Sequence, residues 1–427
     1  MTNLPVYLFT YNCNRQKINS EIFIPKFEES LPAELATLYV FGLQELCSIL
    51  DGSFPQIANQ HLIGYNEVFL KALSSKYGKS DIKFQTISLY HTGSIGLILI
   101  TPYPSKFKHV LCASSSCGYG YSSLKGAVGT RLTYANDWKP GSATVDISVA
   151  CAHLSANEGE AYYQQRNEEV YGLMRSLDFG DGYGLIKPGS HTFFLGDLNY
   201  RTSKSYVASS PSAQRLLSSQ DQSIILRESF TELIDTFDEL TIAKRNGDVF
   251  TGFSEGSIEF PPTYKYHINT AIYNSKRSPS WCDRILYQST YHTNSELVPR
   301  LRSDEQSPHI KLPVVKHYSS ISSILLSDHQ PVYAFIVVPF QAPKSIINSS
   351  GYLKVLPNSD QRSDTHIVSG PTQVYILPTK FDYIIQNYIR HLSDFLVGSS
   401  LWLSFTKNGR ILLLVIIGIL WYLVYVW

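Results

Sequence analysis

The chain has 427 residues, of which 44% are apolar and 17% are charged, so it can bury a large core and does not have the composition of a disordered protein. Its 36 basic and 35 acidic side chains leave a formal net charge of +1. This balance argues against a general nucleic-acid-binding protein, which needs a broad basic surface, although a local basic pocket is compatible with it.

Short apolar runs that end in polar residues recur through the first 340 residues. They predict strands over residues 5–10, 38–43, 94–100, 127–134, 145–152, 192–195 and 331–338. Between two of these runs, Val170, Leu173, Met174 and Leu177 recur at helical spacing. Strands that alternate with helices and carry polar residues at their ends predict an α/β layered domain with its site on one edge.

Regular patterning fades after the last of these strands. Residues 340–380 are rich in Ser, Asn, Asp, Gly and Pro, which predicts a linker between a catalytic domain at 1–339 and the rest. Residues 381–410 then carry an apolar stripe at helical spacing, formed by Ile384, Ile385, Tyr388, Ile389, Leu392 and Leu396. This amphipathic segment either lies on a membrane surface or packs on the domain.

The last seventeen residues, 411–427, contain no charge. A helix there spans about 26 Å, which suits the endoplasmic reticulum bilayer of about 27 Å better than a thicker plasma membrane. Lys407 and Arg410 precede the run, so the positive-inside tendency predicts a tail anchor with the catalytic domain in the cytosol. The alternative is a buried core helix, but such helices seldom are apolar on every face.

The six cysteines are predicted to be reduced thiols. Most lie in or beside apolar runs, where free Cys behaves as a small buried hydrophobe. Cys112 and Cys117 lack the second pair or His cluster that would complete a zinc site. Cys282 is interpreted as a packing residue, because no phosphate-cradling loop accompanies it.

Four clusters of polar residues carry the chemical signal: His153, the run 196–199 (GDLN), the run 281–284 (WCDR) and the run 327–329 (SDH). Hydrolysis of a phosphate ester needs a base for water, charge to neutralise oxygens, and donors for the developing charge. A carboxylate beside an amide and a His beside a second carboxylate supply these groups. A single Asp–His pair is more often structural, so the prediction depends on their joint occurrence.

The runs FFLGDLNYR (193–201) and PSWCDRILY (279–287) resemble the two signature motifs of inositol polyphosphate 5-phosphatases. Further similar runs are TYNCN (10–14), FGLQEL (41–46), KGAVGTR (125–131), AHLSANEG (152–159), PPTYKY (261–266) and SDHQPV (327–332). They follow the family's order over residues 5–338, and the predicted anchor makes the chain most similar to the small fungal membrane-anchored members. The resemblance implies a DNase I-like fold, in which two packed β-sheets are flanked by helices.

The resemblance also implies one Mg²⁺ site and assigns roles to residues that match the family motifs. The implied metal ligand is Glu45, with Asn12 and Asn14 beside it. In catalysis, Asp197 orients and deprotonates the attacking water with support from Asn199. His329 donates to the scissile phosphate, while Asp283 fixes the tautomer of His329. Asp328 lies near the metal, and His153 contacts the phosphate.

For the substrate, the resemblance implies that Tyr264, Lys265, Lys276 and Arg277 read the 4-phosphate of the inositol ring. The alternative for Lys276 and Arg277 is a solvated pair of loop charges. The family often has Asn-Lys-Gly where this chain has Leu-Lys-Gly around Lys125, and the preceding segment CASSSCGYGYSS (112–123) is also atypical. The role of Lys125 in binding the 1-phosphate or the membrane edge is therefore left open.

The predicted function is hydrolysis of the 5-phosphate of phosphatidylinositol 4,5-bisphosphate, with a lipid substrate, a membrane and no nucleic acid as partners. Three alternatives are a nuclease on the same fold, a phosphatase for soluble inositol phosphates, and a non-catalytic membrane tether. The near-neutral net charge and the anchor count against a nuclease. The anchor also counts against soluble inositol phosphates as the main substrate, and the complete catalytic set counts against a non-catalytic tether. The sequence carries no signal for an oligomeric state.

Overall fold

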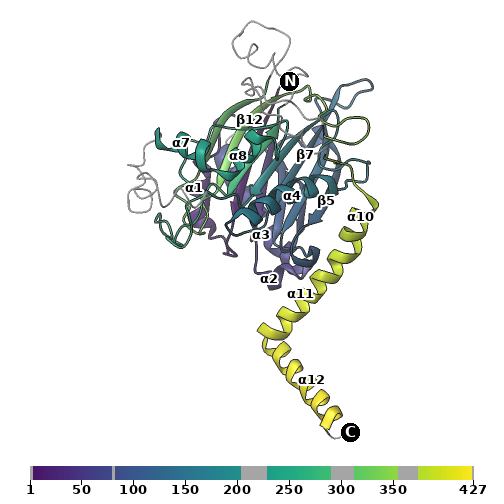
Figure 1. The fold of residues 1–427 in the computed structure, drawn as a ribbon. Coiled ribbons are helices and arrows are strands. Elements are labelled where there is room, and N and C mark those ends of the chain that lie inside the picture. Colours follow the sequence, from purple (N-terminus) through teal and green to yellow (C-terminus); the bar gives the residue numbers. More distant parts are fainter. Residues whose placement is uncertain (1–2, 79–81, 203–227, 290–311, 354–373, 426–427) are drawn as a thin grey trace, which may run out of the picture.

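The computed structural model describes residues 3–78, 82–202, 228–289, 312–353 and 374–425. Two six-stranded sheets pack face to face (Figure 1). The first has the order β11 (Val314–Ser320), β12 (Val332–Pro339), β1 (Asn3–Asn12), β2 (Leu38–Gln44), β4 (Ile95–Thr101) and β3 (Gln85–Thr92). The second has the order β5 (Phe107–Ser116), β6 (Gly126–Ala135), β7 (Thr144–His153), β8 (Ser190–Asp197), β10 (Asp283–Gln288) and β9 (Phe253–Glu255).

Helices cover the outer faces of both sheets. The helices are α1 (Ser20–Glu28), α2 (Ile49–Gly52), α3 (Pro55–Tyr77), α4 (Glu160–Ser176), α7 (Glu228–Phe237) and α8 (Glu239–Asn246), with 3₁₀ turns η2 (Pro104–Lys106) and η3 (Tyr119–Tyr121). The helices α1 and α3 bury an aromatic cluster against the first sheet, in which Phe41 and Phe69 stack at 4.0 Å. The helices α4 and α8 bury aliphatic side chains against the second sheet. The predicted layered sandwich is therefore confirmed.

The two sheets approach each other closely at Gly42 in β2. A Cβ atom at this position would lie 2.9 Å from the Sγ atom of Cys151 and 2.9 Å from a methyl group of Leu195, both in the second sheet. Every residue of β2 is buried, as expected for a strand with apolar neighbours on both faces. A larger residue at Gly42 would push the sheets apart in the core, below the polar edge described next.

The ends of the central strands bring the polar clusters together. The strands β1 and β2 are parallel, with Asn12 beside Gln44, and β7 and β8 are parallel, with His153 beside Asp197. The strand β10 runs antiparallel to β8 and begins at Asp283, opposite Asp197. Polar residues that follow parallel strands therefore gather at one edge of the sandwich, where the sequence predicts the site.

Part of the predicted linker 340–380 is packed on the domain instead of crossing open solvent. Ile346, Ile347, Leu353 and Ile376 join the core on the outer face of the second sheet. The apolar side chains of this polar stretch are too few to form a regular pattern, but they suffice to hold it against the sheet. Residues 354–373, in the middle of the predicted linker, lie outside the described residues.

The chain then forms an extended helical segment that leaves the sandwich (Figure 1). It comprises α10 (Lys380–Ile384), a π-helical turn η5 (Ile385–Ile389), α11 (Arg390–Phe405) and α12 (Lys407–Tyr425). The helix α12 is long and apolar enough to cross a membrane, and hardly any of it is buried. It begins four residues before the predicted anchor at 411–427.

Candidate active site

Asp197 lies at the centre of the polar edge and links the two sheets. Its Oδ2 atom accepts a hydrogen bond from Asn12 Nδ2 at 2.9 Å and lies 3.2 Å from His153 Nε2. Its Oδ1 atom accepts from the backbone N–H of Asn199 at 3.1 Å. Gly196 precedes it with φ of +147°, and a Cβ there would lie 2.0 Å from the Ala152 carbonyl oxygen, so β8 can approach β7 this closely only with glycine.

The buried carboxyl of Asp197 is held in its charged form. Burial alone would raise its pKa, but the imidazoles of His329 and His153 and the ammonium of Lys125 lower the pKa well below its usual range. A carboxylate that stays ionised at neutral pH and is fixed by two amides can orient a water molecule and accept its proton.

His329 forms the second half of the site. Its Nδ1 atom is 2.9 Å from Asp283 Oδ2, which also accepts a 2.6 Å hydrogen bond from Thr263 Oγ1. This contact places the Nδ1 proton toward Asp283, and the Nε2 atom lies 3.8 Å from Asp197 Oδ2. Burial would lower the pKa of His329, but Asp283 and Asp197 outweigh it and raise the pKa to about 9. His329 is therefore an imidazolium that can donate a proton.

Lys125 and His153 form a basic pair on the other side of Asp197. The Lys125 ammonium contacts His153 Nε2, and the position of Lys125 follows from the pairing of Gly126 in β6 with His153 in β7. Burial lowers the pKa of both Lys125 and His153. The Nδ1 atom of His153 is buried and has no hydrogen-bond partner among the residues that the structure describes, whereas Nε2 faces Asp197 and Lys125.

Asn199 and Tyr264 complete the inner site, together with a residue that the sequence reasoning missed. Asn199 Nδ2 donates to the Leu154 carbonyl, and Asn199 Oδ1 accepts from the guanidinium of Arg201. The Arg201 guanidinium also stacks 4.5 Å above the Tyr264 ring, and that ring lies 4.5 Å from the His329 ring. The sequence feature that could have identified Arg201 is its position at the end of the GDLNYR run.

The remaining predicted substrate residues lie at the rim. Lys265 Nζ is 2.7 Å from Asp328 Oδ2, so these two predicted site residues form an ion pair with each other. The backbone N–H of Asn274 donates to the Lys265 carbonyl at 2.7 Å, which places the exposed loop carrying Lys276 and Arg277 next to Lys265. The loop charges are thus brought to the rim but not into the inner cluster.

The oxygen donors at this edge suit a hard divalent cation such as Mg²⁺. Glu45 follows β2 in a left-handed conformation, with φ of +45°, and its carboxylate interacts electrostatically with Lys125 and His153. Arg15 Nε is 3.1 Å from Glu45 Oε2. Asn12 Oδ1 accepts from the backbone N–H of Asn14, which orients the Asn12 side chain beside the Glu45 loop.

A second group of potential ligands is already occupied by its own contacts. Ligand atoms of Asp197, Asp283 and His329 lie within 4.8 Å of one another. Asp283 Oδ2 and His329 Nδ1 are engaged with each other, and Asp197 Oδ2 accepts from Asn12, so a metal ion here would displace these contacts. The Glu45 side of the edge therefore fits a magnesium ion better than this group does.

The sequence matches a known protein family over most of the domain just described. Residues 9–335 match the family described as Endonuclease/Exonuclease/phosphatase family 2. The chain belongs to this family. Its members share the DNase I-like sandwich that the sequence predicted, so the expected fold class is confirmed.

Relatives within this family are 5-phosphatases. Rat Synaptojanin-2 is 26% identical over 72% of this chain and 19% of its own length. The Phosphatidylinositol 4,5-bisphosphate 5-phosphatase INP51 of Saccharomyces cerevisiae is 26% identical over 85% of this chain and 35% of its own length. Type I inositol polyphosphate 5-phosphatase 4 of Arabidopsis thaliana is 31% identical over 50% of this chain and 37% of its own length. The chain thus spans well under half the length of these relatives.

Solved structures give the same fold. The inositol polyphosphate 5-phosphatase domain of a synaptojanin, in complex with inositol (1,4)-bisphosphate and a calcium ion, has a TM-score of 0.59 and 25% identity over 79% of this chain and 86% of that chain. A Cimex nitrophorin in a ferrous NO complex has a TM-score of 0.52 and 19% identity over 79% of this chain and 99% of that chain. The fold therefore hosts unrelated functions, and function is argued from the site.

Proposed function

We propose that this protein hydrolyses the 5-phosphate of phosphatidylinositol 4,5-bisphosphate at a membrane surface, giving phosphatidylinositol 4-phosphate and inorganic phosphate. The observation that carries the proposal is the joining of two acid–base pairs across the sheets, where Asp197 is bound to Asn12 and His153 while Asp283 is bound to His329. The names of two relatives, a phosphatidylinositol 4,5-bisphosphate 5-phosphatase and an inositol polyphosphate 5-phosphatase, support the choice of an inositol 5-phosphate over other phosphate esters.

In the proposed reaction, Asp197 is the base. Its ionised carboxylate orients water for in-line attack on the phosphorus and accepts the proton, while Asn199 holds the carboxylate through its backbone N–H. His329 donates to the phosphate from Nε2, because Asp283 holds the proton of Nδ1. Asp197 then assists the attack of water, and His329 stabilises the charge that develops on the phosphate.

Positive charge around the phosphate is the second requirement. Lys125 and His153 lie beside Asp197, and both are placed to contact phosphate oxygens. The residues that would hold Mg²⁺ are Glu45 with Asn12 and Asn14, and the bound ion would neutralise phosphate charge and stabilise the leaving oxygen. Asp328 is assigned to this side, because the hydroxyl of the preceding residue, Ser327, donates to the Asn12 carbonyl at 2.7 Å.

Recognition of the 4-phosphate is assigned to Tyr264, Lys265, Lys276 and Arg277. The exposed loop with Lys276 and Arg277 is hydrogen-bonded to the backbone of Lys265, so cations from two segments converge on one side of the inner cluster. A phosphate that binds there would compete with Asp328 for Lys265, and charge-assisted hydrogen bonds of this kind discriminate strongly.

The membrane is the second proposed partner. The uncharged run 411–427 follows the four residues that begin α12 (Lys407–Tyr425). A helix of this length spans about 26 Å, which matches the endoplasmic reticulum bilayer more closely than the plasma membrane. Lys407 and Arg410 at the start of α12 favour a cytosolic catalytic domain. The proposed location is therefore the endoplasmic reticulum membrane.

The test measures phosphate release by the full chain with Mg²⁺ from phosphoinositides in vesicles and from soluble inositol phosphates, and cleavage of DNA into shorter fragments, alongside Asp197→Asn. The proposal expects the fastest release from phosphatidylinositol 4,5-bisphosphate and a loss of at least about 10²-fold in the variant. Faster cleavage of DNA, or equal turnover by the variant, would overturn it.

A further inference from the structure

The helical segment 380–405, which comprises α10, η5 and α11 and is called the arm below, is polar on the side that faces the domain. The residues that make this contact are the polar Asp382, Gln386, Arg390 and Asp394, followed by Gly398, spaced four residues apart. Such a row drifts by about 40° at each step in an α-helix. The π-helical turn Ile385–Ile389 adds a residue to one turn and reduces this drift, so the row keeps facing the domain.

Each member of the row has a defined partner. Asp382 pairs with Arg175 of α4 at 2.8 Å, and the Gln386 amide oxygen accepts from the backbone N–H of Ser116. Arg390 Nη1 donates to Ser114 Oγ at 2.6 Å.

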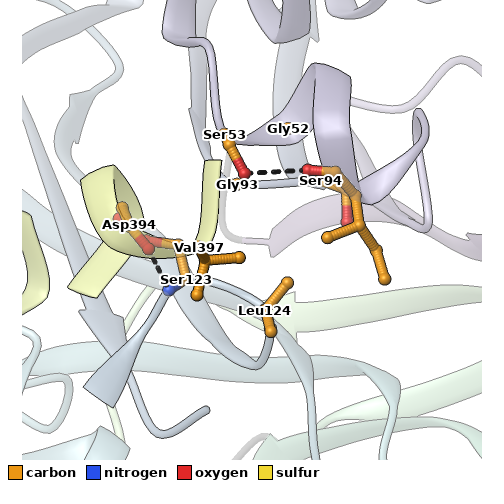
Figure 2. Close-up of a pocket in the computed structure, with 9 residues that line it drawn as sticks. Gly52, Ser53, Gly93, Ser94, Ser123, Leu124, Asp394 and Val397 are labelled. Carbon is orange, nitrogen blue, oxygen red and sulfur yellow. Dashed lines mark hydrogen bonds between the residues drawn. The ribbon is translucent and has the colours of Figure 1, made fainter. Parts of the chain in front are cut away.

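At the far end of the arm, Asp394 accepts from both the backbone N–H and the hydroxyl of Ser123, at 2.7 and 2.6 Å. Figure 2 shows Asp394 and Val397 of α11 seated against Ser123, Leu124 and the Ser53 loop. A Cβ at Gly398 would lie 2.8 Å from Ser53 Cβ, so the helix is in close contact there. Serines of the atypical segment 112–123 thus form hydrogen bonds with the polar side of the arm.

The opposite side of the arm is apolar and exposed. Its members are Phe381, Ile384, Tyr388, Leu392, Phe395 and Leu396, with exposed fractions from 48% to 68%. The two acidic residues of the arm, Asp382 and Asp394, are both bound to the domain, so the exposed side carries no carboxylate. Monomeric soluble proteins rarely leave such a continuous patch in water.

The position of this patch identifies what covers it. The arm leads through the single extended residue Thr406 into α12, the helix that can cross a membrane. The patch also lies next to the edge that carries the active site, because Ser123 is two residues from Lys125 and the arm contacts α2 just beyond β2. In Figure 1 the arm runs from the side of the sandwich past α2 toward α12. A bilayer entered by α12 therefore lies close to the patch.

We infer that the arm is a membrane-docking platform, whose polar side is fixed to the catalytic domain while its apolar side lies in the interface of the bilayer that α12 enters. A helix with one apolar side and aromatic residues suits this interfacial position. The rigid contacts of Asp382 and Asp394 then hold the active-site edge at a set distance from the lipid headgroups. This second consequence depends on the proposed function, whereas lipid contact by the arm does not.

Lipid contact is tested without an activity measurement. The full chain is reconstituted into vesicles of phosphatidylcholine and phosphatidylserine that contain a diazirine-labelled phosphatidylcholine, irradiated, and mapped by mass spectrometry. Labelling of residues 381–396 in addition to α12 is the expected result. Labelling confined to α12, or chain-to-chain cross-links at Tyr388 or Leu392 that indicate a second copy on the patch, would overturn the inference.

Substitutions separate the two sides of the arm. The double variant Leu392→Glu/Leu396→Glu should lower labelling of 381–396 by at least about tenfold, whereas Val314→Glu, at a comparably exposed position on the edge strand β11, should leave it unchanged. Equal labelling of the double variant and the wild type would contradict the inference. Turnover of soluble inositol 1,4,5-trisphosphate reports whether each variant is folded.

The consequence for catalysis is tested with Asp382→Asn/Asp394→Asn, which weakens the polar side. This variant should keep its lipid labelling and its soluble turnover but lose at least about fivefold in turnover of lipid substrate in vesicles. Unchanged lipid turnover would show that docking does not position the active site. Absence of any phosphatase activity in the wild type would instead refute the proposed function and leave the labelling result intact.

Discussion

Replacing Asp283 by Asn is expected to lower turnover by removing a charge while keeping the shape of the site. Asp283 Oδ2 accepts hydrogen bonds from both His329 Nδ1 and Thr263 Oγ1, and an amide oxygen can accept both. The loss of one charge-assisted hydrogen bond to a buried imidazolium costs about 1.5–3 kcal/mol. If this loss falls on the transition state, kcat decreases by about 10- to 100-fold.

The dependence of this loss on pH distinguishes a proton donor from a structural residue. The carboxylate of Asp283 contributes to the raised pKa of about 9 at His329, so its removal lowers the pKa and depletes the imidazolium at alkaline pH. Phosphate release from soluble inositol 1,4,5-trisphosphate should therefore fall more at pH 8.5 than at pH 6.5. The exposed Asp137→Asn serves as a matched control. An equal loss at both pH values would refute this reasoning.

Three further outcomes are expected. Arg277→Ala should slow turnover of phosphatidylinositol 4,5-bisphosphate by about 10- to 100-fold, and phosphatidylinositol 5-phosphate much less; equal losses would mean that the residue acts elsewhere. His191 is buried with its pKa lowered to about 4, so it destabilises the fold as pH falls from 6.5 to 4, by about 3 kcal/mol; denaturation of His191→Gln in detergent micelles should show a pH dependence reduced by this amount. A chain without residues 411–427 should be extracted from membranes by alkaline carbonate while the full chain resists; retention of both would exclude the anchor.

The sequence predicted a layered α/β domain because its strands are apolar on both faces and stand out as short runs, whereas the sandwich of two sheets followed from the resemblance to the 5-phosphatases. The run 38–43 corresponds to β2, in which every residue is buried, and the run 145–152 corresponds to β7. Polar residues at the ends of these runs also located the active-site edge. The roles of Asp197 and His153 followed from the family motifs, each at the end of a different run. Their 3.2 Å contact follows from the parallel pairing of β7 and β8.

Contacts between loops could not be predicted, because they depend on how distant segments approach in space. The ion pair of Lys265 with Asp328 joins residues 63 positions apart, and the sequence assigned them separate roles. The hydrogen bond from Thr263 to Asp283 was missed for the same reason.

The sequence does not decide whether the arm lies on a membrane or packs on the domain, because its apolar stripe suits both surfaces. In the structure, Asp394 and Gln386 bind the domain, and most of the stripe points away from it, although Ile385 is buried and Ile389 is half-buried. The spacing of four residues was visible in the sequence, but its partners in segment 112–123 were not.

The central claim is that the site removes the phosphate from position 5 of an inositol lipid. It is tested most directly by incubating the full chain and Mg²⁺ with vesicles containing phosphatidylinositol 4,5-bisphosphate and identifying the lipid product by ³¹P NMR. The account predicts phosphatidylinositol 4-phosphate as the product, and no product with Asp197→Asn at matched protein concentration. Formation of phosphatidylinositol 5-phosphate, or an unchanged lipid with the wild-type chain, would contradict it.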